Sequence, residues 1–135
     1  MFPNTVRFSE DAQFLGGIPP ASYTTDQEIA WMNLANFHRA VVLTYTGALS
    51  DGMYIDLHEA SDAAGTNEDE FDDSDDDLTL TAADDNTMNI QEVRCEEFTA
   101  GCSWLKVYAG LDVAGPCFYT IEVWGLSPRF AAVST

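Results

Sequence analysis

The chain has 135 residues, of which 23 are acidic and five are lysine or arginine, so its formal net charge is −18. A surface with this charge repels phosphate groups, which excludes nucleic acid bound through a basic face and docking on anionic lipid. The length predicts one domain, and the hydrophobic content of 46% predicts a folded core. We recognise no targeting signal and no membrane-spanning run, so neither a membrane nor a nucleic acid is expected as a partner.

The first 28 residues predict an irregular N-terminal arm, because residues 16–20, GGIPP, combine glycines with consecutive prolines. From residue 29 to 135, short stretches of alternating apolar and polar residues are separated by turn signals. The stretches expected to form strands are 29–34, 36–46, 53–58, 77–82, 87–98, 103–109 and 117–124. No stretch has a helical period, so the sequence predicts an all-β fold: a single-domain antiparallel β-sandwich or barrel.

The acidic residues are concentrated in one region, for which we predict a loop over residues 66–86. Eleven of the 23 carboxylates lie between Asp62 and Asp85, and the rest of the chain has a net charge of only −7. We therefore expect this loop to point into solvent. Asp73, Asp75 and Asp77 match the first three ligand positions of an EF-hand, but leucine follows where the loop needs glycine. A calcium site at these three residues stays an alternative, and the main prediction is no metal and no cofactor.

Catalytic motifs are absent from the sequence, which has no G-x-S-x-G, H-E-x-x-H, P-loop or G-x-G-x-x-G pattern. We therefore expect no enzyme and no catalytic residues. The two histidines, His38 and His58, are expected at the surface, and nothing in the sequence selects a cysteine partner for either. The spacing of Cys95, Cys102 and Cys117 matches no metal or redox motif, which predicts free thiols. A Cys102–Cys117 disulfide is the alternative.

Three stretches of the chain carry short motifs in a fixed order. They are W-x-x-L-x-x-[FY]-x-R-[AV] at Trp31–Ala40, L-x-x-A-x-D-A-x-G at Leu57–Gly65 and G-x-x-P-R-[FY] at Gly125–Phe130, with I-x-x-[IV] at Ile90–Val93 between the last two. In this order and spacing the motifs resemble a group of small structural proteins of tailed bacteriophages, encoded in the head-gene region. The resemblance covers most of residues 29–132, and the acidic insertion and the three cysteines depart from it.

The resemblance implies a jelly-roll β-sandwich that acts as a head decoration (cement) protein or minor virion component on the outer surface of the capsid, assembled in the host cytoplasm. Its implied partners are the major capsid protein and further copies of itself, with a trimer expected and a dimer or pentamer as alternatives. The alternative role is a head fibre, neck or tail component that binds a host receptor or glycan through exposed aromatic side chains. The basic residues lie outside the acidic loop. The residues expected at the capsid or subunit interface are Arg7, Phe14, Arg39, Arg129 and Phe130.

Overall fold

The protein's structure, a computed structural model, describes residues 11–71, 78–112 and 115–128. These residues form nine strands and two short 3₁₀ helices. In chain order the strands are β1 (Ala12–Tyr23), β2 (Gln27–Asn33), β3 (Phe37–Leu49), β4 (Met53–Ala60), β5 (Asp69–Glu70), β6 (Leu78–Leu80), β7 (Met88–Arg94), β8 (Trp104–Leu111) and β9 (Cys117–Pro128). The 3₁₀ helices are η1 (Ala82–Asp84) and η2 (Cys95–Glu97).

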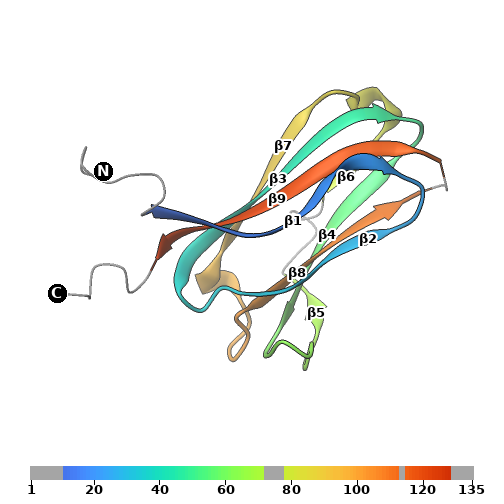
Figure 1. The fold of residues 1–135 in the computed structure, drawn as a ribbon. Coiled ribbons are helices and arrows are strands. Elements are labelled where there is room, and N and C mark those ends of the chain that lie inside the picture. Colours follow the sequence, from blue (N-terminus) through green and yellow to red (C-terminus); the bar gives the residue numbers. More distant parts are fainter. Residues whose placement is uncertain (1–10, 72–77, 113–114, 129–135) are drawn as a thin grey trace.

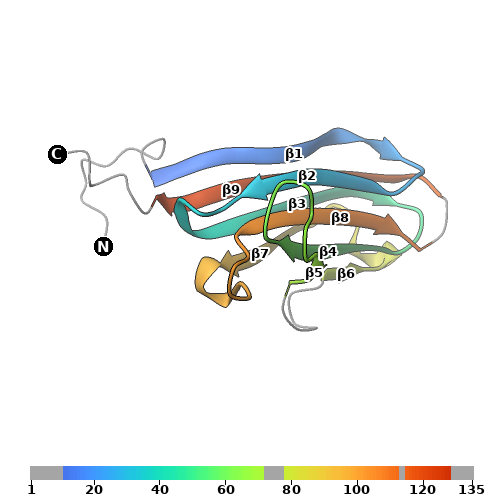
Figure 2. The ribbon, with the colours of Figure 1, turned by 90° about the horizontal axis from the view of Figure 1, so that it is seen from below.

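The strands form two antiparallel sheets, with the orders β1-β9-β3-β7 and β2-β8-β4-β5, and β6 also pairs with β4 (Figure 1). The pairs are nested along the chain: β1 pairs with β9, β2 with β8, β3 with β7, and β4 with the short β5 and β6. Successive nested pairs alternate between the two sheets, which is the double Greek key of a jelly roll. The predicted all-β jelly-roll sandwich is therefore confirmed. Figure 2 shows β5 and β6 beside β4 at one side of the second sheet.

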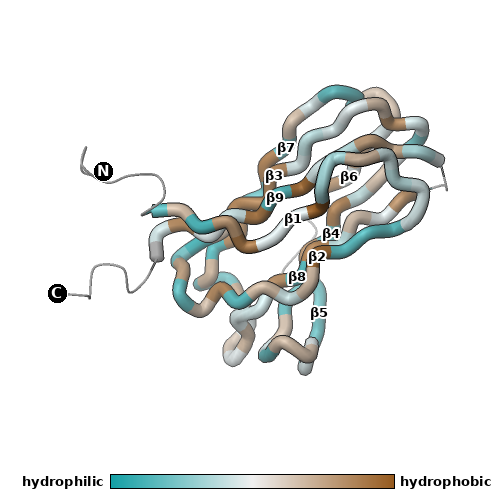
Figure 3. Tube along the Cα trace, viewed as in Figure 1, coloured by the Kyte–Doolittle hydropathy of each residue, from teal (hydrophilic) through white to brown (hydrophobic). Residues whose placement is uncertain are grey.

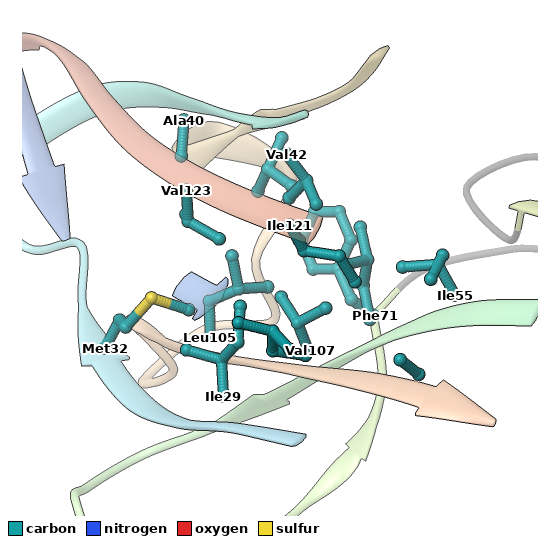
Figure 4. Packing of buried hydrophobic residues seen from close by; sticks show 14 of the residues in the cluster. Ile29, Met32, Ala40, Val42, Ile55, Phe71, Leu105, Val107, Ile121 and Val123 are labelled. Carbon is teal, nitrogen blue, oxygen red and sulfur yellow. The ribbon is translucent and has the colours of Figure 1, made fainter. Parts of the chain in front are cut away.

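The core lies between the two sheets, because successive side chains of a strand point to opposite faces. Hydrophobic and hydrophilic residues accordingly alternate along the strands in Figure 3. Figure 4 shows the inner faces meeting, with Val42, Ile121 and Val123 from one sheet opposite Leu105 and Val107 from the other. These five side chains are fully buried.

The prediction of an irregular N-terminal arm is wrong for residues 12–23, which form β1 and pair with β9 along the edge of the first sheet. The pairing is interrupted by register shifts between Phe14 and Gly16 and between Ile18 and Ala21. Prolines are tolerated on an edge strand at such bulges, because no neighbouring strand needs their missing N–H. The GGIPP sequence that indicated a loop is therefore the bulged part of an edge strand.

The predicted acidic loop 66–86 contains β5, β6 and η1, so part of it belongs to the second sheet. In the described part of this loop, three carboxylates accept hydrogen bonds from backbone N–H groups, the first being Asp69 from Glu70 at 2.8 Å. Asp84 accepts a hydrogen bond from the Thr81 backbone N–H at 2.8 Å in a capping box, and Asp85 accepts one from the Leu49 N–H at 2.7 Å. The calcium alternative at Asp73, Asp75 and Asp77 lies outside the described residues.

Candidate functional site

The first two sequence motifs meet where the turn after β4 packs on β2. Gly65 has a φ of +80°, and a Cβ atom built on it would lie 3.0 Å from Nε1 of Trp31. The Asp62 carboxylate holds this turn by accepting hydrogen bonds from the backbone N–H groups of Ala64 and Thr66, at 2.9 and 3.1 Å. The hydrogen bonds from Thr66, side chain first, keep the pKa of Asp62 below its usual value. These motif residues therefore shape a turn, and their role is structural.

The first and third motifs meet on the side of the β1-β9-β3-β7 sheet that faces the core of the sandwich. A Cβ atom at Gly125 in β9 would lie 2.8 Å from two ring carbons of Phe37 in β3, closer than any real contact. Both residues are buried. Glycine at 125 therefore makes room for the aromatic ring of the first motif. The Gly65–Trp31 and Gly125–Phe37 contacts involve no nucleophile, acid or base. This agrees with a structural role for the motifs.

The outer face of the β1-β9-β3-β7 sheet is apolar and uncovered by other described residues. Its apolar side chains, which we call the apolar face, are Phe14, Val41, Leu43, Tyr45, Met88, Ile90, Phe118, Trp124 and Leu126. The large hydrophobic residues that are exposed in the described part of the chain are Phe14, Tyr45, Met88, Ile90 and Phe118, and all five lie on this face. Contiguous apolar surface of this kind marks interaction sites on soluble proteins.

Strand register places these side chains side by side. Trp124 of β9 is paired with Phe14 of β1 on one side and with Val41 of β3 on the other. The rings of Phe14 and Trp124 pack edge to face, with centroids 5.5 Å apart. One row further along, Leu43 of β3 is paired with Ile90 of β7. The apolar face therefore crosses all four strands of the sheet.

On this sheet face Arg39 and Arg94 are balanced by Glu92 and Glu122, although the whole chain is strongly acidic. Glu92 of β7 lies 3.8 Å from the Arg39 guanidinium and 3.6 Å from that of Arg94. These residues, with His38 and Glu96, line an open cavity of about 310 Å³. The structure thus places two of the predicted interface residues, Phe14 and Arg39, on one face of one sheet. The other three, Arg7, Arg129 and Phe130, lie outside the described residues.

The opposite outer face, on the β2-β8-β4 sheet, is polar and aromatic. Lys106 of β8 lies over the rings of Trp31 and Tyr108, at 5.6 and 4.9 Å from their centroids, and its Nζ is 3.2 Å from a Glu28 oxygen. Burial lowers the pKa of Lys106, but hydrogen bonds to Tyr108 and Glu28 outweigh burial and raise it. Trp104 lies on the same strand face, as the alternation in the sequence predicted.

A cavity of about 220 Å³ opens on this polar face between β4 and β8. Its lining includes the rings of Tyr54, Tyr108 and His58 and the carboxylates of Asp26 and Asp56. Burial, followed by the negative charges of neighbouring aspartates, raises the pKa of Tyr54. The cavity therefore presents aromatic surface and hydrogen-bond acceptors together, which is the chemistry that recognises polyhydroxylated ligands.

A third cavity, of about 320 Å³, lies at the end of the sandwich and contains Glu59, Thr99 and Cys102. The buried Glu59 carboxylate accepts hydrogen bonds from the backbone N–H of Thr99, at 2.9 Å, and from its hydroxyl. Burial and the nearby Glu59 raise the pKa of the Cys102 thiol, so the thiolate needed for nucleophilic chemistry is disfavoured. Neither histidine lines this cavity.

The cysteines are free thiols, as predicted, with Cys95 and Cys117 buried and Cys102 half-buried, so the alternative Cys102–Cys117 disulfide is not formed. Across residues 11–71, 78–112 and 115–128, no three histidine, cysteine or acidic side chains are grouped as a metal site would need. The described part of the chain also contains no helix with the length and hydropathy to span a membrane.

No protein-family model matches the chain, and no curated protein matches it. Among solved structures, a chain in a structure of Triatoma virus is similar, with 9% sequence identity and a TM-score of 0.44, over 93% of this chain and 68% of that chain. A chain in an X-ray structure of the Triatoma virus empty capsid has 11% identity and a TM-score of 0.43, over 89% and 88% of the two chains. Because both similarities are weak, the jelly-roll assignment rests on the strand order of this protein.

Proposed function

We propose that this protein is a non-enzymatic structural subunit of a tailed-phage virion that binds the outer surface of the head and stabilises it. The observation that carries the proposal is the apolar face, where all five exposed large hydrophobic residues of the described chain gather on one sheet. A surface of this kind is suited to docking on another protein. The three motifs that resemble phage head proteins support the choice of that protein, the major capsid protein.

The charge distribution supports an outer location. Eleven of the 23 carboxylates lie between residues 62 and 85. The outer sheet face that carries the apolar face holds two cations and two carboxylates. A partner can therefore meet a locally neutral surface while the acidic region stays hydrated, and the total charge of −18 disfavours the DNA-facing side of a shell. Repeated docking of many copies requires only modest affinity from each one.

The experiment adds purified protein to heads assembled without it, and measures binding by co-sedimentation and position by cryo-electron microscopy. We expect hundreds of copies over the outer surface and a higher melting temperature of the heads. Phe14→Glu, on the apolar face, should abolish binding, while Tyr54→Glu, on the opposite sheet, should leave binding intact. A few tens of copies confined to vertices or the tail would contradict a cementing role.

The aromatic cavity on the polar face favours one second function, a head-fibre, neck or tail component that binds a host glycan. Tyrosine rings beside carboxylates are suited to stack on sugar rings and accept hydrogen bonds from their hydroxyl groups. A glycan array tests this function. Binding that disappears in Tyr54→Ala and Tyr108→Ala but persists in Phe14→Ala would support it, and an array without signal would remove it.

A further inference from the structure

The β7 strand forms an edge of its sheet, and its outer edge has no strand partner among the residues that the structure describes. An edge strand presents unpaired backbone N–H and C=O groups that can pair with another strand. Proteins usually protect such edges with bulges, prolines, lysines or very short strands. Whether β7 is protected in this way therefore decides what its edge can do.

The other edges of the sandwich are protected. β1 carries two register shifts and the Pro19-Pro20 pair, and the pairing of β2 is shifted between Ile29 and Met32. The opposite edge of the second sheet consists of the short strands β5 and β6. β7 differs from all of these, because its seven residues pair with β3 without a shift and include no proline, glycine or lysine.

The same strand carries the most exposed large hydrophobic side chains in the described part of the chain. Ile90 is 59% exposed and Met88 is 52% exposed. A second strand beside β7 would cover part of both side chains as well as the free backbone edge. Burying them would stabilise the contact, by the same effect that keeps such residues inside proteins.

We propose that β7 pairs antiparallel with β7 of a second copy of this chain, across a two-fold axis at Ile90. The two β1-β9-β3-β7 sheets then form one continuous sheet, and the two apolar faces join into one surface. The contact is isologous, because the same strand supplies both sides, as in most two-fold homodimers. This inference goes beyond the proposed function and does not depend on it, since the dimer can form whether or not the protein binds a phage head.

Charge favours a second copy as the occupant. Although each chain has a net charge of −18, the single cation and the single carboxylate of β7 cancel, so two such strands meet without net repulsion. In an antiparallel pair centred on Ile90, Met88 lies opposite Glu92, so no like charges face each other.

The side chains on the inner side of β7 also suit this register. Asn89 of each copy lies opposite Gln91 of the other, and two amide side chains can donate to and accept from each other. A seven-residue edge buries less surface than a standard interface of about 800 Å² per partner, so we expect micromolar rather than nanomolar affinity.

Sedimentation equilibrium over a wide concentration range tests the state of association. The wild-type protein should show a monomer–dimer equilibrium. Ile90→Lys should weaken dimerisation about 10-fold or more, because two isoleucines leave the contact and two like charges face each other at the axis. Phe14→Lys is the matched control: it places the same charge on the other edge strand of the same sheet, and the dimer should be unaffected.

Disulfide formation tests the register. In a Cys102→Ser background, the Ile90→Cys variant should form a covalent dimer on mild oxidation, because residues paired at the axis have Cα atoms about 5 Å apart, within disulfide range. In the Met88→Cys variant the two thiols are displaced by four residues along the strands, roughly 13 Å, and should not react. Circular dichroism and urea unfolding confirm that each variant is folded.

Four outcomes would overturn the proposal. They are a protein that stays monomeric at every concentration, a trimer, an Ile90→Lys variant that dimerises as well as the wild type, and cross-linking through position 88 instead of position 90. A wild-type protein that dimerises but does not bind heads would contradict the proposed function alone, and a wild-type protein that binds heads but stays monomeric would contradict this inference alone.

Discussion

The contact between Gly125 and Phe37 allows a quantitative prediction, because it joins the first and last sequence motifs in the core. An alanine Cβ at position 125 would lie 2.8 Å from two Phe37 ring carbons, about 1 Å inside normal contact distance. The ring is 94% buried and has little room to move. Overpacking of this kind costs about 1–3 kcal/mol, and removing a strand glycine returns about 0.5–1 kcal/mol.

We therefore expect Gly125→Ala to lower the free energy of unfolding by about 1–2 kcal/mol. Phe37→Leu alone should cost about 1–2 kcal/mol, because it removes part of a buried ring. In the double variant the smaller leucine leaves space for the new methyl group, so the two costs should not add. The coupling energy should be favourable by about 1 kcal/mol.

Urea unfolding followed by tryptophan fluorescence measures all four members of this double-mutant cycle. Gly101→Ala combined with Phe37→Leu is the control pair, because nothing lies within 4 Å of a Cβ at position 101 and only its φ of +89° opposes the substitution. The control pair should be additive. Additivity of the Gly125 pair within about 0.5 kcal/mol would refute the steric reasoning.

Three further predictions concern buried polar groups and the motif turn. Tyr119→Phe should change stability by less than about 1 kcal/mol in urea unfolding, since the fully buried hydroxyl has no hydrogen-bond partner among the described residues; a larger loss would reveal a partner. Because burial and then Glu59 raise the pKa of Cys102, its alkylation rate should rise with pH at a higher midpoint than that of an ordinary cysteine. Glu59→Gln should lower this midpoint, and an unchanged midpoint would exclude the charge effect. Gly65→Ala should cost about 1–3 kcal/mol in thermal unfolding, because alanine is strained at a φ of +80° and its methyl group meets Trp31; a cost near zero would mean that the turn relaxes freely.

The positions of most strands could be predicted from alternation alone. The stretches 103–109 and 117–124 correspond to β8 and β9, and 53–58 corresponds to β4. In each stretch apolar and polar residues alternate, because one face of the strand packs on the core. This pattern is visible within a few consecutive residues of the sequence. β1 was missed for the same reason, since its prolines indicate a loop locally and become acceptable only at the bulged edge of a sheet.

The candidate site was only partly predictable. Phe14 and Arg39 were expected at an interface, and the structure places both on the outer face of one sheet. The exposure of Met88 and Ile90 was not expected, because the sequence marks them as apolar without indicating which side of β7 is covered. The alternation along the strand contains a signal for them. Val93 lies on the opposite side of β7 from Met88 and Ile90, and Val93 is buried, so the other two side chains face outward.

The sequence by itself determined the all-β fold class and the acidic character of the chain. These properties follow from composition and from the alternation of apolar and polar residues, whereas the packing of the motif glycines on Trp31 and Phe37 is seen only in the structure. Only the tertiary structure decided which strands are edges and which sheet face lacks a cover. The physical reason is that a strand's neighbours in a jelly roll come from distant parts of the chain, so β7 becomes an exposed edge only after β3 has paired with both β7 and β9.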